Sequence, residues 1–299
     1  MKIPRNINVG DKIGIISPAR KISFLELSPA IKILESWGLK VILAEAIFEE
    51  DHQFSATIAK RASSLQVMIN DNSIKAILCA RGGYGTVQII DKINFNNLQD
   101  SPKWIIGYSD ITVLHSHLHQ LGVATIHATM PVNFQSNTKA SLQSLQQTIF
   151  RKKNIITCTA NKYNRLGSVE AKVVGGNLSV LYSLLGSESD LDTEEKILFI
   201  EDLDEYLYHI DRMMINLKRN GKFKYLKGMI VGGMMDMKDN PIQFGRNAYE
   251  IILSNLEEYN FPICFGFPSG HINDNRSIIL GVKSTLNVKE NDVNLSQYL

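Results

Sequence analysis

The sequence predicts an α/β fold with two domains, each built on a sheet that contains parallel strands. Two observations lead to this prediction. In the first half, short runs rich in β-branched residues alternate with longer segments of helical periodicity, and the alternation resumes after a polar stretch in the middle. Alternating strands and helices are typical of βαβ units, in which helices cover a parallel sheet. A chain of 299 residues is long enough for two such domains.

The first half is expected to alternate strands and helices from its beginning. Strands are expected at 12–17, 40–44, 74–80, 104–108 and 123–129, and helices at 24–37, 55–70 and 110–121. The last of these helices has apolar residues at helical spacing from Ile111 to Leu121, and Gly122 follows as a stop.

A polar stretch at 136–165 is interpreted as the linker between an N-terminal domain at 1–135 and a C-terminal domain at 166–299. The stretch is rich in Ser, Gln, Asn, Thr and Lys, with one short helix and one weak strand. Beyond it, helices are expected from 177, at 206–220 and at 244–258, and strands at 171–176, 196–202, 228–234, 262–267, 277–282 and 284–288. The C-terminal domain is therefore also α/β, with more strand toward its end.

Composition favours a small-molecule partner. The formal net charge is +2 and no long run carries one sign, so nothing indicates nucleic acid or an anionic membrane surface. The three cysteines, Cys79, Cys158 and Cys264, are far apart without a C-x-x-C pair, which argues against a disulfide framework or a thiolate zinc site. No segment resembles a signal peptide or a membrane span, so we expect a soluble, cytoplasmic protein.

Chemically capable side chains stand at the exits of three expected strands. Ser109 and Asp110 follow one strand, Glu201 and Asp202 end another, and His271 follows a third. Ligands of parallel sheets bind beyond the carboxyl ends of the strands, so these side chains are candidates for one site. A serine nucleophile needs a base such as histidine, and the histidine needs an acceptor on its other nitrogen. Either Glu201 or Asp202 could serve as that acceptor.

A serine nucleophile also needs hydrogen-bond donors for the oxyanion. A tight turn between strand and helix puts the backbone N–H of Asp110 beside Ser109. The loop at 80–86 has the sequence Ala-Arg-Gly-Gly-Tyr-Gly-Thr, and glycines let backbone N–H groups approach a substrate closely. We expect the second donor to be Gly82 or Gly83.

Each of these residues also has a structural interpretation. Serine and aspartate are favoured at helix N-caps, so Ser109 could simply begin a helix. Glu201 could be one of several solvated acids, and His271 could be a loop histidine. The loop at 80–86 could be an ordinary glycine turn or a phosphate cradle, although it matches neither of the common phosphate-binding patterns.

Six segments, in this order, resemble the serine L,D-carboxypeptidase family, the muramoyltetrapeptide carboxypeptidases. They are GDKIGIISPA (10–19), ARGGYGT (80–86), IIGYSDIT (105–112), VVGGNLSVL (173–181), ILFIEDLDEYLYHIDRMMINL (197–217) and GHINDNRSIILG (270–281). The resemblance implies a flavodoxin-like or Rossmann-like N-terminal domain and a swivelling α/β C-terminal domain. It also implies that Ser109 is the nucleophile, that Glu201 rather than Asp202 is the acid, and that His271 is the base.

The resemblance further implies an activity. Such enzymes release the terminal D-alanine from cytoplasmic peptidoglycan tetrapeptides through an acyl-enzyme, without a metal or organic cofactor, and homodimers are common among them. Their oxyanion donors fall on the amides of Asp110 and Gly83. We add the hypothesis that Arg81 binds the terminal carboxylate, with Gly82 and Tyr84 beside it, although a structural role for Arg81 is as compatible with the sequence. Residues 126–131 depart from the family's histidine-glycine-proline pattern.

Two other functions compete with this one. The microcin C immunity branch resembles the family in fold and triad but cleaves aminoacyl or peptidyl nucleotide conjugates, with an added loop that stacks an aromatic residue on the base. Residues 160–174 are a short stretch without tryptophan, which favours the peptidoglycan substrate. The second alternative is a binding protein that clamps a small ligand without chemistry, in which Ser109 only caps a helix.

Overall fold

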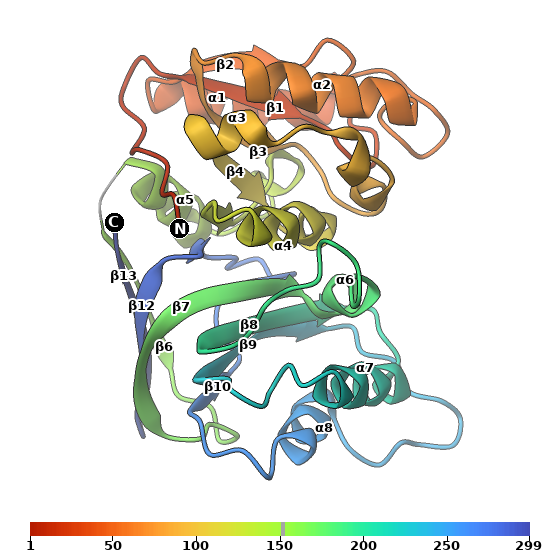
Figure 1. Cartoon of the computed structure of the whole chain (residues 1–299), viewed down its shortest axis with the longest axis vertical. Helices are drawn as coiled ribbons and strands as arrows, with labels where there is room; N and C mark the ends of the chain where they lie inside the picture. Colours follow the sequence, from red (N-terminus) through yellow and green to blue (C-terminus); the bar gives the residue numbers. More distant parts are fainter. Residues whose placement is uncertain (151–152) are drawn as a thin grey trace.

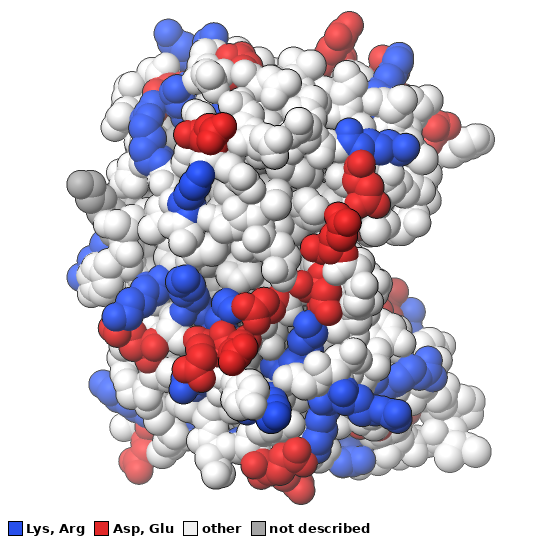
Figure 2. All heavy atoms as spheres, in the orientation of Figure 1, with Lys and Arg blue, Asp and Glu red and all other residues white. Residues whose placement is uncertain are grey.

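The chain folds around two β-sheets, one in the upper and one in the lower part of Figure 1. This computed structural model describes residues 1–150 and 153–299. No helix among these residues combines the length and the apolar character that crossing a bilayer requires. On the face drawn in Figure 2, acidic and basic side chains are interspersed, with no broad area of one sign.

The N-terminal sheet contains five parallel strands in the order β2-β1-β3-β4-β5. This is the order of flavodoxin-like doubly wound sheets, so the predicted fold of this domain is confirmed. The strands are β1 (Lys12–Ile16), β2 (Lys40–Leu43), β3 (Ile74–Cys79), β4 (Trp104–Gly107) and β5 (Thr125–His127). The helices that connect them are α1 (Phe24–Ser36), α2 (Ile58–Asn70), α3 (Asn96–Asp100) and α4 (Thr112–Gln120).

Local chemistry explains where these helices begin. Ser23 precedes α1 and forms a capping box with Glu26, in which each side chain accepts from the other's backbone N–H. Thr57 caps α2 by accepting from the N–H of Lys60. Short 3-10 turns, η1 (Thr86–Gln88), η2 (Ile90–Lys92), η3 (Ser109–Ile111) and η4 (Pro131–Asn133), occupy the loops near the carboxyl ends of the strands.

The second sheet is mixed, with the order β10-β9-β8-β7-β12-β13-β6. Four strands are parallel: β7 (Gly167–Asn177), β8 (Lys196–Leu203), β9 (Gly228–Met235) and β10 (Ile263–Phe265). Three further strands pair antiparallel: β12 (Lys283–Val288), β13 (Asp292–Tyr298) and β6 (Lys153–Thr159). The helices are α6 (Leu178–Ser183), α7 (Leu207–Arg219) and α8 (Ala248–Asn255). The predicted α/β character, with more strand toward the end, is confirmed.

One segment from the C-terminal half joins the N-terminal sheet. Strand β11 (Ile278–Leu280) pairs antiparallel with β5, and Ile278 lies opposite His127. The strand expected at 277–282 therefore exists but belongs to the other sheet, because an apolar run identifies a strand and not its partner. The stretch predicted as a linker, 136–165, contains helix α5 (Lys139–Phe150) and the whole of the edge strand β6.

Three apolar cores pack against the two sheets. One core lies in the N-terminal domain and includes Trp104, which is fully buried and donates its Nε1 hydrogen to the carbonyl of Arg5. Two others belong to the second sheet, one including apolar residues of α7 and α8 and the other residues of β12 and β13. The strands are thus held rigidly, and they can position side chains at their carboxyl ends.

Candidate active site

Ser109 follows strand β4 on a strained turn. Its φ is +63°, in the left-handed region that costs a residue other than glycine about 1–3 kcal/mol. Neither η3 nor the following helix α4 has a side-chain cap hydrogen bond, so the interpretation of Ser109 as a helix cap is wrong. A Cβ on Gly107 would come within 2.9 Å of Ile111, which shows how closely this turn is packed.

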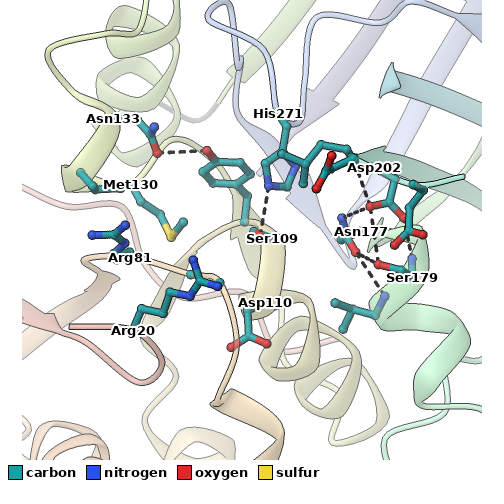
Figure 3. A pocket seen from close by; sticks show the side chains of 18 residues that line it. Arg20, Arg81, Ser109, Asp110, Met130, Asn133, Asn177, Ser179, Asp202 and His271 are labelled. Carbon is teal, nitrogen blue, oxygen red and sulfur yellow. Dashed lines mark hydrogen bonds between the residues drawn. The ribbon is translucent and has the colours of Figure 1, made fainter. Parts of the chain in front are cut away.

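A chain of hydrogen bonds joins Ser109 to His271 and Glu201 across the two domains. The Ser109 hydroxyl is 3.1 Å from Nε2 of His271, and Nδ1 of His271 is 2.6 Å from Oε2 of Glu201. Figure 3 shows the imidazole above the serine. The Glu201 side chain is fully buried, whereas that of His271 is 12% exposed. This is the arrangement in which a carboxylate orients an imidazole that can accept a proton from the serine.

The backbone around His271 holds the imidazole against Glu201. The N–H of His271 also donates to Oε2 of Glu201, at 3.1 Å. Gly270 has a φ of +108°, and a Cβ there would lie 2.7 Å from both Cβ and Oε2 of Glu201. The N–H of Gly270 donates to Oδ1 of Asn275, which is itself buried. The loop therefore approaches β8 at a distance that only glycine permits.

The pKa values of this pair move in opposite directions. Burial by itself would raise the pKa of Glu201, but His271, through its charge and hydrogen bond, and the nearby His127 outweigh it and lower that pKa. Burial by itself would lower the pKa of His271, but the charge and hydrogen bond of Glu201 outweigh it and raise that pKa. A more basic imidazole is a stronger acceptor for the proton of Ser109.

Asp202, the other candidate acid, faces different partners. Its carboxylate accepts from the side-chain amide of Asn177 and from the N–H groups of Ser179 and Leu203. Burial and the neighbouring charge of Glu201 raise its pKa to about 7. Of the two acids that the residues alone left open, Glu201 is therefore the one hydrogen-bonded to His271.

Of the two glycines considered as oxyanion donors, Gly82 is the one that lies beside Ser109 and Asp110. A Cβ on Gly82 would lie 3.1 Å from Cβ of Ser109 and 3.4 Å from the backbone nitrogen of Asp110. The Asp110 side chain is buried and turned away, and it accepts from the N–H of Thr86. Gly83 has a φ of +102° and lies against the side chain of Arg20. Which amide binds an oxyanion stays a prediction.

A cavity of about 520 Å³ opens in front of Ser109 and His271. Loops that follow β1, β3, β4 and β5 line it from the N-terminal domain, and loops that follow β7, β8 and β10 line it from the C-terminal domain. The lining residues are Arg20, Arg81, Gly82, Gly83, Tyr108, Ser109, Asp110, Met130, Val132, Asn133, Asn177, Ser179, Val180, Asp202, Leu203, Asp204, Glu205 and His271. The strand-exit rule used on the sequence therefore describes the whole cavity.

The predicted substrate-binding residues have different positions. Gly82 and Arg81 line the cavity, and Nη1 of Arg81 is 3.2 Å from Oε1 of Glu26. Tyr84 is not among the lining residues; its ring packs 6.2 Å from that of Phe54 and is about half exposed. A role for Tyr84 in substrate binding stays a prediction.

Sequence reasoning did not select most of the cavity lining, and two of the residues it missed, Arg20 and Tyr108, lie beside the candidate catalytic group. Arg20 lies at the exit of β1, and its side chain packs on Gly83. The ring of Tyr108 lies 4.8 Å from the imidazole of His271, tilted by 57°, and its hydroxyl donates to Oδ1 of Asn133. Arg20 would have been found by applying the strand-exit rule to the first strand, and Tyr108 precedes the candidate serine directly. Within residues 1–150 and 153–299, no group of three or more His, Cys, Asp or Glu could hold a metal ion.

Comparison with known proteins agrees with this geometry. Residues 13–128 match the LD-carboxypeptidase N-terminal domain, and residues 170–286 match the LD-carboxypeptidase C-terminal domain. The chain belongs to this family of peptidases. It is therefore a hydrolase of the serine carboxypeptidase class.

Relatives of this chain include proteins with two kinds of name. The Bacillus subtilis (strain 168) protein named "Probable murein peptide carboxypeptidase" is 35% identical over 96% of this chain and 92% of its own length. The Escherichia coli "Microcin C7 self-immunity protein MccF" is 25% identical over 97% of this chain and 95% of its own. The crystal structure of muramoyltetrapeptide carboxypeptidase from Oxalobacter formigenes has the same fold, with a TM-score of 0.88 at 24% identity, over 96% of this chain and 99% of that one.

Proposed function

We propose that the protein is a serine-type L,D-carboxypeptidase that releases the terminal D-alanine from cytoplasmic peptidoglycan tetrapeptides, in cell-wall recycling. The observation that carries the proposal is the hydrogen-bonded chain of Ser109, His271 and Glu201 at the edge of the cavity. The Bacillus subtilis relative, with murein peptide carboxypeptidase in its name, supports the choice of substrate.

The geometry supports a two-step acyl transfer. His271 takes the proton of the Ser109 hydroxyl as its oxygen attacks the carbonyl carbon that precedes D-alanine, and Glu201 stabilises the imidazolium. The amides of Asp110 and Gly83 bind the oxyanion. His271 then gives the proton to the amine of the departing D-alanine. Water, deprotonated by His271, attacks the acyl-enzyme, and the proton returns to Ser109 as the tripeptide leaves.

Two arginines at the cavity are candidates to bind the terminal carboxylate of the substrate. Arg81 was suggested by the sequence, but Glu26 already pairs with it. Arg20 has no hydrogen bond or ion pair from its guanidinium to any residue in the described part of the chain, and it packs on Gly83. These contacts favour Arg20 as the main partner of the carboxylate, with Arg81 and Gly82 adjacent.

Mass spectrometry of a peptidoglycan tetrapeptide incubated with the protein tests the proposal. The expected result is release of a single D-alanine by the parent protein. Ser109→Ala should reduce the rate by about 10³-fold or more, because it removes the nucleophile and leaves the fold intact. Circular dichroism checks the fold. Turnover by Ser109→Ala at the parent rate would exclude the proposed nucleophile.

Cleavage of aminoacyl or peptidyl nucleotide conjugates is the second candidate, because the Escherichia coli relative is named as a microcin C7 self-immunity protein. None of the residues 160–174 lines the cavity. The aromatic residue of this stretch, Tyr163, packs on Tyr249 and Phe265 and donates its hydroxyl to Glu250, so it is not free to stack on a base. Comparing hydrolysis of the tetrapeptide with that of an aminoacyl sulfamoyl adenosine discriminates the two. A protein that binds tetrapeptide equally well as parent and Ser109→Ala, without turnover in either, would be a binding module.

A further inference from the structure

The second carboxylate oxygen of Glu201 has no partner within the described residues. Oε2 accepts from both the side chain and the backbone of His271, whereas Oε1 accepts no hydrogen bond. The side chain is fully buried. A buried carboxylate oxygen without a donor is destabilising, and native structures seldom leave one.

The imidazole of His127 lies near that oxygen. His127 ends strand β5 in the N-terminal domain and is fully buried, and both of its ring nitrogens lack a hydrogen-bond partner among the described residues. Its Nε2 is 4.0 Å from Oε1 of Glu201. A relative movement of about 1 Å would bring the two atoms to the ordinary distance of a hydrogen bond.

The surroundings of His127 leave Glu201 as its acceptor. The ring of Phe199 meets it edge-on at 4.8 Å, and the ring of Tyr108 lies at 5.9 Å. His115 of α4 is 6.3 Å away, but its own Nε2 bonds to the carbonyl of Gly107. The two unsatisfied polar groups, one on each domain, are therefore complementary and adjacent.

We propose that His127 donates its Nε2 hydrogen to Oε1 of Glu201 and so fixes the carboxylate against His271. His127 is then a positioning residue: it acts through Glu201 and contacts neither the substrate nor the reacting atoms. Both oxygens of the carboxylate are engaged, and the N-terminal domain contributes to orienting the base of the C-terminal domain. The inference rests on the proposed function only in taking Ser109, His271 and Glu201 as the reacting group.

The donor has a predictable effect on the base. The Glu201–His271 pair carries one negative charge when His271 is neutral and none when it is protonated, and a donor on Glu201 stabilises the first state more. Losing the donor should therefore move the acid limb of the pH profile to higher pH. Other ionisable groups around the pair are Asp202, Tyr108 and His115, and they are unchanged in the variants used below.

The test uses labelling of Ser109 by a fluorophosphonate, which reports serine nucleophilicity without the natural substrate. His127→Leu should lower the labelling rate on its alkaline plateau by about tenfold or more and move the acid limb to higher pH. His127→Gln, which keeps a donor, should restore much of both. His119→Leu is the matched control. Like the ring nitrogens of His127, Nδ1 of His119 has no hydrogen-bond partner among the described residues, but its ring lines an interior space to which Glu201 does not contribute. This variant should have the labelling rate and pH profile of the parent protein.

A second measurement needs neither substrate nor labelling reagent and compares the parent protein with the same variants. The Nδ1 proton of His271, bonded to Glu201, should give a downfield proton resonance in nuclear magnetic resonance spectra, and this resonance should move in His127→Gln and in His127→Leu but not in His119→Leu. A parent-like rate and profile in His127→Leu, or a Gln variant as impaired as the Leu variant, would overturn the role of His127. A parent protein that is not labelled at Ser109 would overturn the proposed function together with it.

Discussion

At the scale of single residues, the imidazole of His271 lies between an alcohol and a carboxylate, and its protonation governs both reactivity and stability. Because its pKa is raised in the folded protein, its interaction with Glu201 stabilises the fold below the ordinary histidine pKa, and this contribution is lost as pH rises through the folded value. The pKa of Glu201 is lowered, so its contribution is present above the ordinary glutamate pKa and is lost as pH falls through the folded value. The pair is therefore most stabilising between those limits.

Reactivity should follow the same imidazole. We expect kcat/KM to fall on the acid side with a midpoint above the ordinary histidine value of about 6.5, because only neutral His271 accepts the proton of Ser109. Glu201→Gln removes the charge that raises this pKa, so it should move the midpoint to lower pH and also reduce kcat. The pH profile of tetrapeptide hydrolysis measures both. An unchanged midpoint in Glu201→Gln would show that Glu201 does not set the pKa of His271.

The two arginines can be distinguished by substrates that differ only at the terminus. Arg20→Gln should reduce kcat/KM for a tetrapeptide with a free terminal carboxylate by about 10–100-fold, and much less for the terminal amide, because a charge-assisted hydrogen bond is lost only with the first. Arg81→Gln should have the smaller effect, since Glu26 already engages Arg81. If the preference for the free carboxylate over the amide is lost in Arg81→Gln and kept in Arg20→Gln, then Arg81 is the residue that binds the carboxylate.

At the scale of elements, the site depends on close contacts of the loops that follow the strands, either with each other or with a neighbouring strand. The buried guanidinium of Arg61 on α2 donates to the carbonyls of Pro18 and Gly85, so one side chain ties the loop after β1 to the glycine loop after β3. The loop after β10 approaches Glu201 through Gly270. These contacts hold separate strand exits at fixed distances from each other.

Gly270→Ala tests the loop after β10. The added methyl group would collide with Glu201 and push it or His271 away, and a displacement of this size is expected to lower kcat by about 100-fold. Gly221→Ala is the matched control, since Gly221 also has a positive φ, +75°, but a Cβ there meets nothing within 4 Å. The control should lose about 1–2 kcal/mol of stability and no activity. Steady-state kinetics and thermal unfolding compare the two variants, and equal losses of activity would contradict the collision.

The local sequence pattern predicted the positions of the strands better than it predicted which strands pair. Strong apolar runs such as those of β3 and β8 were expected within a residue or two of their observed bounds. Strand β13 (Asp292–Tyr298) was not expected, because only two apolar residues, Val293 and Leu295, alternate with polar residues before its final tyrosine, and so short a pattern is a weak strand signal. Its neighbours β12 and β6 supply the pairing that the local sequence does not reveal.

At the scale of the whole molecule, strand pairing and buried hydrogen bonds join the two domains, in addition to the chain that connects them. Strand β11 completes the N-terminal sheet from the C-terminal half. The hydroxyl of Thr112 on α4 accepts from the N–H of Asn177 at the end of β7, and Ser141 of α5 donates to the carbonyl of Asn275. These buried contacts join the two halves of the chain, so the domains should not unfold independently.

Thr112→Val tests this coupling. Valine matches threonine in shape but leaves the buried N–H of Asn177 without an acceptor, at a cost of about 1–3 kcal/mol. Both tryptophans, Trp37 and Trp104, lie in the N-terminal domain, so their fluorescence reports that domain while hydrogen exchange of β8 and β9 reports the other. In Thr112→Val, the thermal transition seen by fluorescence and the temperature at which the amides of β8 and β9 lose their protection from exchange should both fall by the same amount. A fluorescence transition that moves while the exchange of β8 and β9 stays unchanged would contradict one cooperative unit.

The sequence by itself determined the fold class, most of the order of strands and helices, and the strand exits at which Ser109, Glu201 and His271 stand, because these depend on periodicity and turn chemistry over short stretches. Between Glu201 and Asp202 the residues alone left the choice open, the resemblance selected Glu201, and the tertiary structure shows its contact with His271. Only the tertiary structure decided that β11 crosses to the other sheet and that Arg20 and His127 lie at the site. Ser109 and His271 are 162 positions apart, and their 3.1 Å contact depends on how two cores pack against each other. Packing of that kind is a property of side-chain shapes meeting in space, which no local pattern encodes.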